Sequence, residues 1–380
     1  MIFSGYLAEI INVIANIGSR GLSLLLVLFG IAVIRNGTKI HHNILWLLTI
    51  IIILSPIIIS FDSELIIDSF INFVLILILL ILLSKQLYKQ LFISKNLSSI
   101  LFYGFFALTI ISVFQYRSDI YLFGRPILFF SEPAHMVREL SVAMAIILAN
   151  LTRNRFENLN IVLFLFVGIF CPSLLAVTFA FGFSFIKFIN YLRNSSLRRR
   201  FLQSFYACLA LIFLVPYLFQ FSYFFERIVS ISDYENSENF TALVLLQGYE
   251  NAYLVLTNSF FGEGIGQAAN SPKGLITQII YDLSAGKSLN LEDAGSLFPK
   301  LVIELGWPGL FLSIGLIVIS IKKIFINPKT TQEKLLQFIS MVFLICFVFR
   351  SSGYFTTINV VFLLSFIYIP KYTNVNSRRL

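Results

Sequence analysis

Long apolar runs, separated by short polar or charged segments, recur from the first residues of the chain almost to the last. One helical crossing of a bilayer takes about 20 apolar residues, so eleven crossings would take about 220 residues, more than half of this chain of 380. Hydrophobic side chains make up 58% of the residues and charged ones 12%, against roughly 45–50% and 25% in soluble domains. The pattern excludes a water-soluble fold and predicts an all-α polytopic membrane protein.

The apolar runs predict about eleven transmembrane helices, and residues 2–17 leave a twelfth crossing open. Those residues are apolar but carry polar side chains, so a surface helix or an extension of the first crossing are the alternatives. The chain divides into an N-terminal helix bundle over 1–221, a large loop over 222–298, and C-terminal helices with a tail over 299–380. The predicted crossings are 17–34, 44–60, 66–83, 97–115, 133–150, 159–172, 174–190, 201–221, 299–320, 335–349 and 352–369.

Six short segments between the runs hold 19 of the 28 Lys and Arg residues but only two of the 19 acidic residues. By the positive-inside rule these basic segments face the cytoplasm, which places the C-terminus inside and the 222–298 loop in the periplasm. The net charge of +9 therefore reflects membrane topology and does not indicate a nucleic-acid partner. The basic segments are 35–43, 84–96, 151–158, 187–200, 321–334 and 371–380.

The 222–298 loop is polar and acidic, and its 77 residues make it by far the longest in the chain. Loops of this length are usually functional or disordered. Leucines at helical spacing between Phe240 and Phe260 predict that part of the loop folds against the membrane face. A large folded loop on one side of a helical bundle indicates chemistry or recognition on that side.

Cys171, Cys208 and Cys346 lie in or at the edge of apolar runs, without a CxxC spacing. They are predicted to be packing residues, and neither a disulfide framework nor a metal site is indicated. The sequence also has no HExxH motif and no nucleophile elbow. No metal and no other cofactor is expected.

The most informative motif is a predicted helix start at the outer membrane surface, where Pro133 favours the first helical turn. At 100° per residue, Glu132, His135 and Glu139 fall within about 80° of one another, and about 60° separates Arg138 from His135. Ionisable side chains inside a membrane span are costly and by default mark a functional site. The alternative is an internal pair of Arg138 and Glu139 that only fixes helix packing.

Three further arginines, Arg125, Arg227 and Arg350, flank apolar runs on the outer side and are expected at the outer rim. A helix N-terminus surrounded by arginines suits an anion, because backbone N–H groups and guanidinium groups both bind phosphate oxygens. Each arginine taken alone is equally well explained as an interfacial anchor.

Four short motifs resemble, in their order along the chain, the Wzy O-antigen polymerases. They are the helix start at 129–135, the opening of the long loop at 226–231, the glycine turn at 261–267, and the entry to the ninth crossing at 301–309. The glycine turn is also similar to a nucleotide phosphate loop, but it follows no strand, so a simple turn is favoured. Hydropathy order and loop placement agree with the family over nearly the whole chain.

The resemblance implies a metal-independent glycosyltransferase of the GT-C-like class in the bacterial inner membrane, with its active site facing the periplasm. Members transfer a growing chain from undecaprenyl diphosphate to the sugar of an incoming lipid-linked repeat unit, so no nucleotide sugar is needed. The implied partners are undecaprenyl-diphosphate-linked oligosaccharides and the lipid bilayer, together with a chain-length regulator and a flippase. An O-antigen ligase, a flippase or other transporter, and a receptor or channel scaffold stay open as alternatives.

A sugar on a lipid diphosphate is already activated, so catalysis requires stabilising the departing pyrophosphate charge and accepting a proton from the acceptor hydroxyl. Arginines and a helix N-terminus supply the first, and a carboxylate or imidazole near the outer surface supplies the second. The predicted site consists of diphosphate ligands (Arg125, Arg227 and Arg350), base candidates (Glu132, assisted by His135) and residues that support them (Arg138 and Glu139).

Related O-antigen ligases carry a His nine residues before the Glu of an E-x-G-x-x-G motif, and an Arg about eighteen residues before the glycine turn. Gly295 and Val244 occupy those positions here. This argues against a ligase and leaves open which basic residue of the long loop serves the leaving group. A flippase is expected to have repeated halves and charges near the bilayer midplane, whereas the charges of this chain crowd the outer surface.

Overall fold

The computed structural model describes residues 133–150, 154–170, 173–194, 239–287 and 291–350, together with isolated positions between 103 and 118, at 237 and 289, and between 356 and 365. All regular secondary structure in these ranges is helical. The first three predicted crossings and the eighth lie outside the described residues. So do the predicted site residues Arg125, Glu132 and Arg227.

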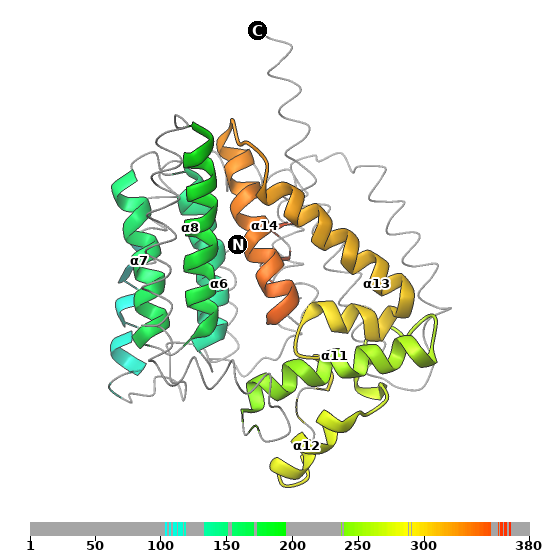
Figure 1. Ribbon diagram of the computed structural model, residues 1–380. Helices are drawn as coiled ribbons and strands as arrows, with labels where there is room; N and C mark the ends of the chain where they lie inside the picture. Colours follow the sequence, from blue (N-terminus) through cyan, green and yellow to red (C-terminus); the bar gives the residue numbers. More distant parts are fainter. Residues whose placement is uncertain are drawn as a thin grey trace, which may run out of the picture.

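Helices follow one another along the whole described part of the chain (Figure 1). Three of them, α8, α13 and α14, are long and apolar enough to cross a membrane. The elements are α6 (Pro133–Asn150), α7 (Asn154–Phe170), α8 (Leu174–Asn194), α11 (Phe240–Asn258), the short 3₁₀ helix η2 (Ala268–Asn270), α12 (Leu275–Leu283), α13 (Leu297–Ile324) and α14 (Thr331–Phe349).

Five helices coincide with predicted crossings and form a bundle: α6, α7, α8, α13 and α14. Some of them begin earlier than the apolar run that predicted them. Helix α14 begins at Thr331, four residues before the predicted start. Hydropathy marks the apolar length of a helix, whereas its backbone continues into polar residues where the terminal N–H groups are capped. Here Thr330 and Glu333 form a capping box, in which each side chain accepts the other's N–H at 3.2 Å.

Short connections determine how the bundle helices run. Three residues join α6 to α7 and three join α7 to α8, so each helix is antiparallel to the next and α6 is parallel to α8. Helices α6 and α8 both pack on α14. Buried aromatic rings fill part of the shared core, with Phe164 edge-on to Phe179 and Phe183 at centroid distances of 6.2 and 6.0 Å. Cys346 is also buried there and free, which confirms its prediction as a packing residue; Cys171 and Cys208 lie outside the described residues.

At one end of the bundle, α8 is fixed to the loop between α13 and α14. The Arg193 guanidinium donates to the carbonyls of Phe325, at 2.7 Å, and Ile326. Asn190 donates to the Gln337 side chain at 2.8 Å. These contacts join two of the six basic segments, which agrees with their predicted placement on the same side of the membrane. We call this the inner end.

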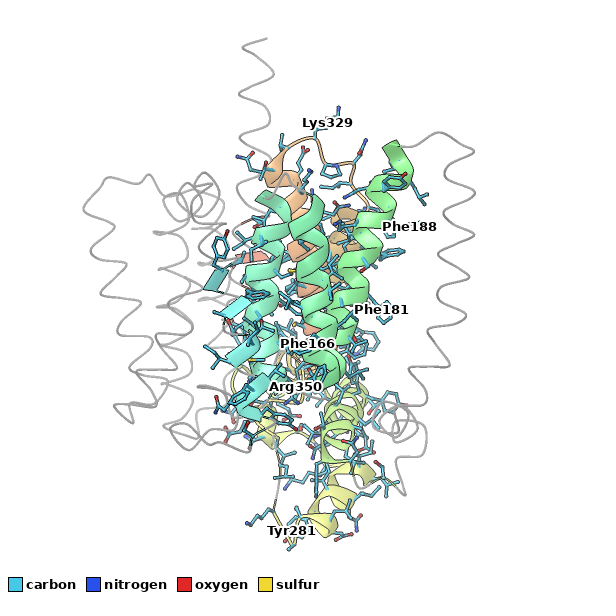
Figure 2. The ribbon with its side chains drawn as sticks, turned by 90° about the vertical axis from the view of Figure 1, so that its left-hand side faces the viewer. Phe166, Phe181, Phe188, Tyr281, Lys329 and Arg350 are labelled. Atoms are coloured by element: carbon cyan, nitrogen blue, oxygen red, sulfur yellow. The ribbon has the colours of Figure 1, made fainter. Side chains whose placement is uncertain are left out.

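The opposite end carries the described part of the long loop. Figure 2 shows Lys329 at the inner end and Tyr281 at the other extreme, with Arg350 between them. Helix α11 lies across the lower ends of α13 and α14 in Figure 1, and α12 lies below α11. The helix predicted between Phe240 and Phe260 is confirmed. We call this the outer end.

Polar contacts hold α11 and α12 together. The Glu250 carboxylate of α11 accepts the N–H groups of Leu275 and Ile276, both at 2.9 Å, and so caps the start of α12. Gln247 donates to the Thr277 hydroxyl at 3.1 Å in the same interface. This part of the long loop is therefore a folded unit.

Candidate functional site

Arg350 ends α14 at the outer end and is half-buried. The 19 residues of α14 correspond to about 28 Å of helix, close to the thickness of the hydrocarbon layer. When α14 spans the membrane, Arg350 therefore lies at one interface, which is the outer one in the topology predicted from the sequence. Its backbone N–H donates to the Cys346 carbonyl at 3.0 Å, which holds it in the last turn.

Helix α6 runs antiparallel to α14 and brings its own ionisable residues to the same place. The two helices pack on each other, and Cys346 of α14 is buried in the same core as Met136 and Leu140 of α6. Arg350 lies four residues, about 6 Å, beyond Cys346 towards the outer end. His135 lies in the first turn of α6, so each residue lies at the outer end of its helix.

Arg138 and Glu139 form the internal pair that the sequence left as an alternative. Arg138 Nε lies 3.2 Å from Glu139 Oε1, and Glu139 is buried. The Ser141 hydroxyl also donates to the Arg138 carbonyl at 2.6 Å. A buried charge pair of this kind is destabilising to break and adds little stability compared with apolar residues. Its presence explains how two charges are accommodated inside a membrane helix.

Tyr249 of α11 connects the long loop to the outer end of α14. Its hydroxyl donates to the Val348 carbonyl at 2.8 Å. Its ring stacks on Phe298 at 5.7 Å, and Phe298 meets Phe347 edge-on at 6.0 Å. Burial raises the pKa of the Tyr249 hydroxyl. Phe298 therefore packs the first turn of α13 against the last turn of α14.

The sequence did not single out Tyr249, because one tyrosine within an apolar helical pattern carries no distinguishing signal. Its role depends on a contact 99 residues away along the chain. By contrast, the start of α6 at Pro133 and the pairing of Arg138 with Glu139 follow from local rules, and the structure confirms both.

Lys300 belongs to the basic residues of the outer side, and its contacts are to oxygens of the protein itself. Its Nζ donates to the Glu292 carbonyl at 2.9 Å and lies 3.8 Å from Asp293 Oδ1 and 3.9 Å from Glu304 Oε1. Glu304 is completely buried. Because a buried carboxylate needs a compensating charge, Lys300 is a partner for Glu304.

Helix α13 is interrupted where the motif at 301–309 places two helix breakers close together. Gly306 has a φ of 62°, in the left-handed region. Pro308 has no N–H to donate to the carbonyl of Glu304, four residues earlier. The Trp307 N–H likewise has its partner outside the helix, so the carbonyl of Ile303 also loses its helical donor.

The glycine turn supplies the missing partners. The N–H groups of Glu263 and Gly264 donate to the carbonyls of Ile303 and Glu304, at 2.9 and 3.0 Å, while the Trp307 N–H donates to the carbonyl that precedes the turn, at 2.9 Å. Two motifs of the resemblance, 40 residues apart, therefore form one structural unit. The predicted turn is confirmed, and its function here is to cap a broken helix.

The two positions at which ligases carry His and Arg lie side by side. Gly295 has a φ of 68°, and a methyl group on it would lie 2.8 Å from the Val244 carbonyl oxygen. This contact leaves no room for a side chain at Gly295, and Val244 is itself buried and apolar. The described part of the long loop thus lacks the ligase pattern in space as well as in sequence.

Among the predicted site residues that the structure describes, His135, Arg138 and Glu139 lie in the first two turns of α6, and Arg350 ends α14, which packs on α6. Within the described residues, no group of three or more His, Cys, Asp or Glu side chains could hold a metal ion. No family model matches the chain, and neither does any curated protein or solved structure.

Proposed function

We propose that this protein is an O-antigen polymerase of the Wzy type, a polytopic glycosyltransferase of the bacterial inner membrane with about eleven crossings. In this proposal the 222–298 loop is periplasmic and the C-terminus is cytoplasmic. The ordered motifs of the sequence support the assignment, as does the folding of two of them, the glycine turn and the α13 kink, into one unit beside the outer end.

The observation that carries the proposal is the gathering of cationic and titratable groups at the outer end. Arg350, His135 and the Arg138–Glu139 pair lie where α6 begins and α14 ends. The start of α13 is held there too, through the stack of Tyr249 on Phe298. Two helix N-termini and an arginine at one membrane interface suit a diphosphate.

The reaction requires the bond between the anomeric carbon of the donor sugar and the diphosphate oxygen to break, and a bond to the acceptor hydroxyl oxygen to form. Arg350, with Arg125 and Arg227, stabilises the negative charge on the departing diphosphate. Glu132 accepts the proton of the acceptor hydroxyl, with His135 as its assistant or substitute. No oxidant, metal or nucleotide is required for this balance.

The test is the surface polysaccharide of a strain that lacks this protein. Without a polymerase, single repeat units are still flipped and ligated, so the surface molecule carries one unit and the ladder of longer chains disappears. The wild-type gene should restore the ladder and Glu132→Gln should not. Long polymer retained on the lipid carrier would indicate a ligase, and a surface without even one unit would indicate a flippase.

A further inference from the structure

Four aromatic side chains stand on the surface where the glycine turn meets the kink of α13. Phe260, Phe261, Trp307 and Phe311 are 60, 58, 38 and 65% exposed. We call them the aromatic edge. Phe260 and Phe261 meet edge-on at 5.0 Å, and Trp307 and Phe311 lie 6.2 Å apart. The four rings form two adjacent pairs.

The aromatic edge is held in place by backbone bonds and is not required for the core beneath it. The Trp307 indole N–H donates to the Leu256 carbonyl at 3.2 Å, and the Trp307 backbone N–H donates to the Phe260 carbonyl. On the inward side, α11 and α13 pack through small and branched residues, including Val255 and Val302. The Trp307 ring is therefore fixed by its own hydrogen bond, and all four rings stay exposed.

The aromatic edge continues a strip of exposed apolar residues along the second half of α13. Phe311, Ile314, Val318 and Ile321 are exposed and spaced by three or four residues, so they lie on one face of the helix. On a helix long and apolar enough to cross a membrane, an exposed apolar strip faces lipid. The strip ends at Lys322 and Lys323 towards the inner end.

The depth of the aromatic edge follows from α11. Tyr249 contacts Val348, next to the outer end of α14. Helix α11 lies across the lower ends of α13 and α14 (Figure 1) and ends at Asn258, two residues before Phe260. This places the rings near the level of Arg350. Aromatic side chains gather at this level in membrane proteins, because their rings suit the boundary between lipid head groups and acyl chains.

We propose that the aromatic edge binds the outer surface of the bilayer and lies at the boundary between head groups and acyl chains. The partner is a phospholipid surface. The consequence is that α11 and the glycine turn rest on the membrane, so the folded part of the long loop works at head-group depth. The inference does not depend on the proposed glycosyltransferase activity.

Fluorescence quenching of Trp307 tests this directly, because the chain has only two tryptophans, Trp46 and Trp307. The full chain with Trp46→Phe is reconstituted in phosphatidylcholine vesicles that contain lipids brominated either near the head group or near the chain end. The shallow bromines should quench about twofold more strongly than the deep ones, and aqueous iodide should quench weakly. If Trp46→Phe is not produced, the difference between wild type and Trp307→Phe gives the same signal.

Three results would overturn the proposal: strong iodide quenching without bromine quenching, stronger quenching by the deep bromines, or no quenching by any of these probes. The first would place the loop in water, the second would place the kink inside the hydrocarbon, and the third would mean that protein covers the rings. Replacing Phe260 and Phe261 by Ser in the same background should lower bromine quenching and raise iodide quenching. An unchanged profile would remove this pair from the interface.

Discussion

The two ends of the bundle are built from different chemistry. At the inner end, Arg193 donates to two backbone carbonyls, and Asn190 pairs with Gln337 through neutral amides. At the outer end, charges face other charges inside the protein, as in the pair of Arg138 with Glu139. Hydrogen bonds to backbone carbonyls and amides stabilise the structure, but these groups neither accept nor donate a proton in a reaction near neutral pH. The comparison teaches that the outer end carries a cost in buried charge that a purely structural contact would avoid, which is why the proposed function assigns the reactive side chains to that end.

The same contrast holds for the two arginines that end helices. Arg193 is bound at the inner end by carbonyl oxygens, and Arg350 ends α14 at the outer end. If only the outer end is functional, the two should respond differently to the same conservative substitution. The predictions below test that difference, from the largest expected effect to the smallest.

The largest effect is expected from Arg350→Lys, compared with Arg193→Lys as its matched control. Lys keeps the charge and can reach the interface, but it cannot offer the bidentate geometry that phosphate oxygens accept from Arg. Arg350→Lys should lower polymer yield by a factor of about 100 or more, and the same loss is expected for Arg125→Lys and Arg227→Lys. Arg193→Lys should leave the polymer ladder unchanged.

The measurement is the polysaccharide ladder in a complemented deletion strain, normalised to the amount of protein in the membrane. A normal ladder with Arg350→Lys at normal protein abundance would mean that this arginine only anchors α14 at the interface. The two ends of the bundle would then not differ in function at these arginines.

The next effect separates reactive from structural carboxylates within α6 and the residue before it. Glu132→Gln should abolish the polymer at normal abundance, because an amide has nearly the same shape but cannot take a proton. Glu139→Gln should mainly lower abundance, since it leaves Arg138 without its partner at 3.2 Å. We expect a loss of about 2 kcal/mol, less than the 3–5 kcal/mol of a fully buried pair, because Arg138 keeps some exposure.

Abundance is measured by membrane immunoblot and activity by the same ladder. His135→Ala completes the set: if Glu132→Gln polymerises normally while His135→Ala does not, the base is His135. If both variants retain activity, the catalytic centre is not at the start of α6.

The unit formed by the glycine turn and the α13 kink is predicted to be the structural weak point of the outer end. A methyl group on Gly306 would lie 2.3 Å from the Phe260 carbonyl oxygen, and its φ of 62° is unfavourable for any side chain. Gly306→Ala should therefore destabilise the protein by about 2 kcal/mol or more. Gly315→Ala is the control, because no atom lies within 4 Å of the added methyl group.

Gly315→Ala should be neutral or stabilise α13 by up to about 1 kcal/mol, since Ala is the better helix former. Thermal unfolding in detergent gives both values. Limited proteolysis then locates the damage, because Gly306→Ala should open the segment after α11 while α8 and α14 stay protected. If Gly306→Ala and Gly315→Ala changed the melting temperature equally, the kink would accommodate a side chain at position 306 without strain.

Local rules predicted much of the fold from the sequence. Pro133 marked the start of α6, leucine spacing marked α11, and adjacent opposite charges marked the pair of Arg138 and Glu139. Each of these signals acts within a few residues, so a single sequence contains it. The boundaries of α7 and α14 were predicted less well, because hydropathy stops at the first polar residues while capped helices continue.

The candidate site was predicted less completely, because its assembly depends on contacts distant in the chain. The contact of Tyr249 with Val348 spans 99 residues, and no periodicity marks it. The union of the glycine turn with Gly306 also has no local signal: the sequence shows two glycine motifs, but not that the N–H groups of one cap the carbonyls of the other. The catalytic and binding roles of all the predicted site residues, those that the structure describes as well as Arg125, Glu132 and Arg227, stay predictions.

The smallest effect concerns Glu263 in the glycine turn, whose half-buried carboxyl has a pKa raised above its ordinary value by burial. The folded protein therefore keeps this proton to higher pH than the unfolded chain does. As pH rises through the raised pKa, the carboxyl ionises and its contribution to stability is lost. Glu263→Gln removes this loss, so the variant should gain in melting temperature over wild type as pH rises from 4 to 7.

Glu292→Gln, at an exposed carboxyl, controls for the loss of one negative charge. The hydrogen bonds described above for Arg193, Asn190 and Gln337 at the inner end join guanidinium, amide and carbonyl groups, none of which titrates between pH 4 and 7. A difference in melting temperature between Glu263→Gln and wild type that stays constant from pH 4 to 7 would show that the Glu263 carboxyl is fully hydrated. The charge pairs would then be the remaining difference between the outer and the inner end, because burial of the Glu263 carboxyl would no longer distinguish the two ends.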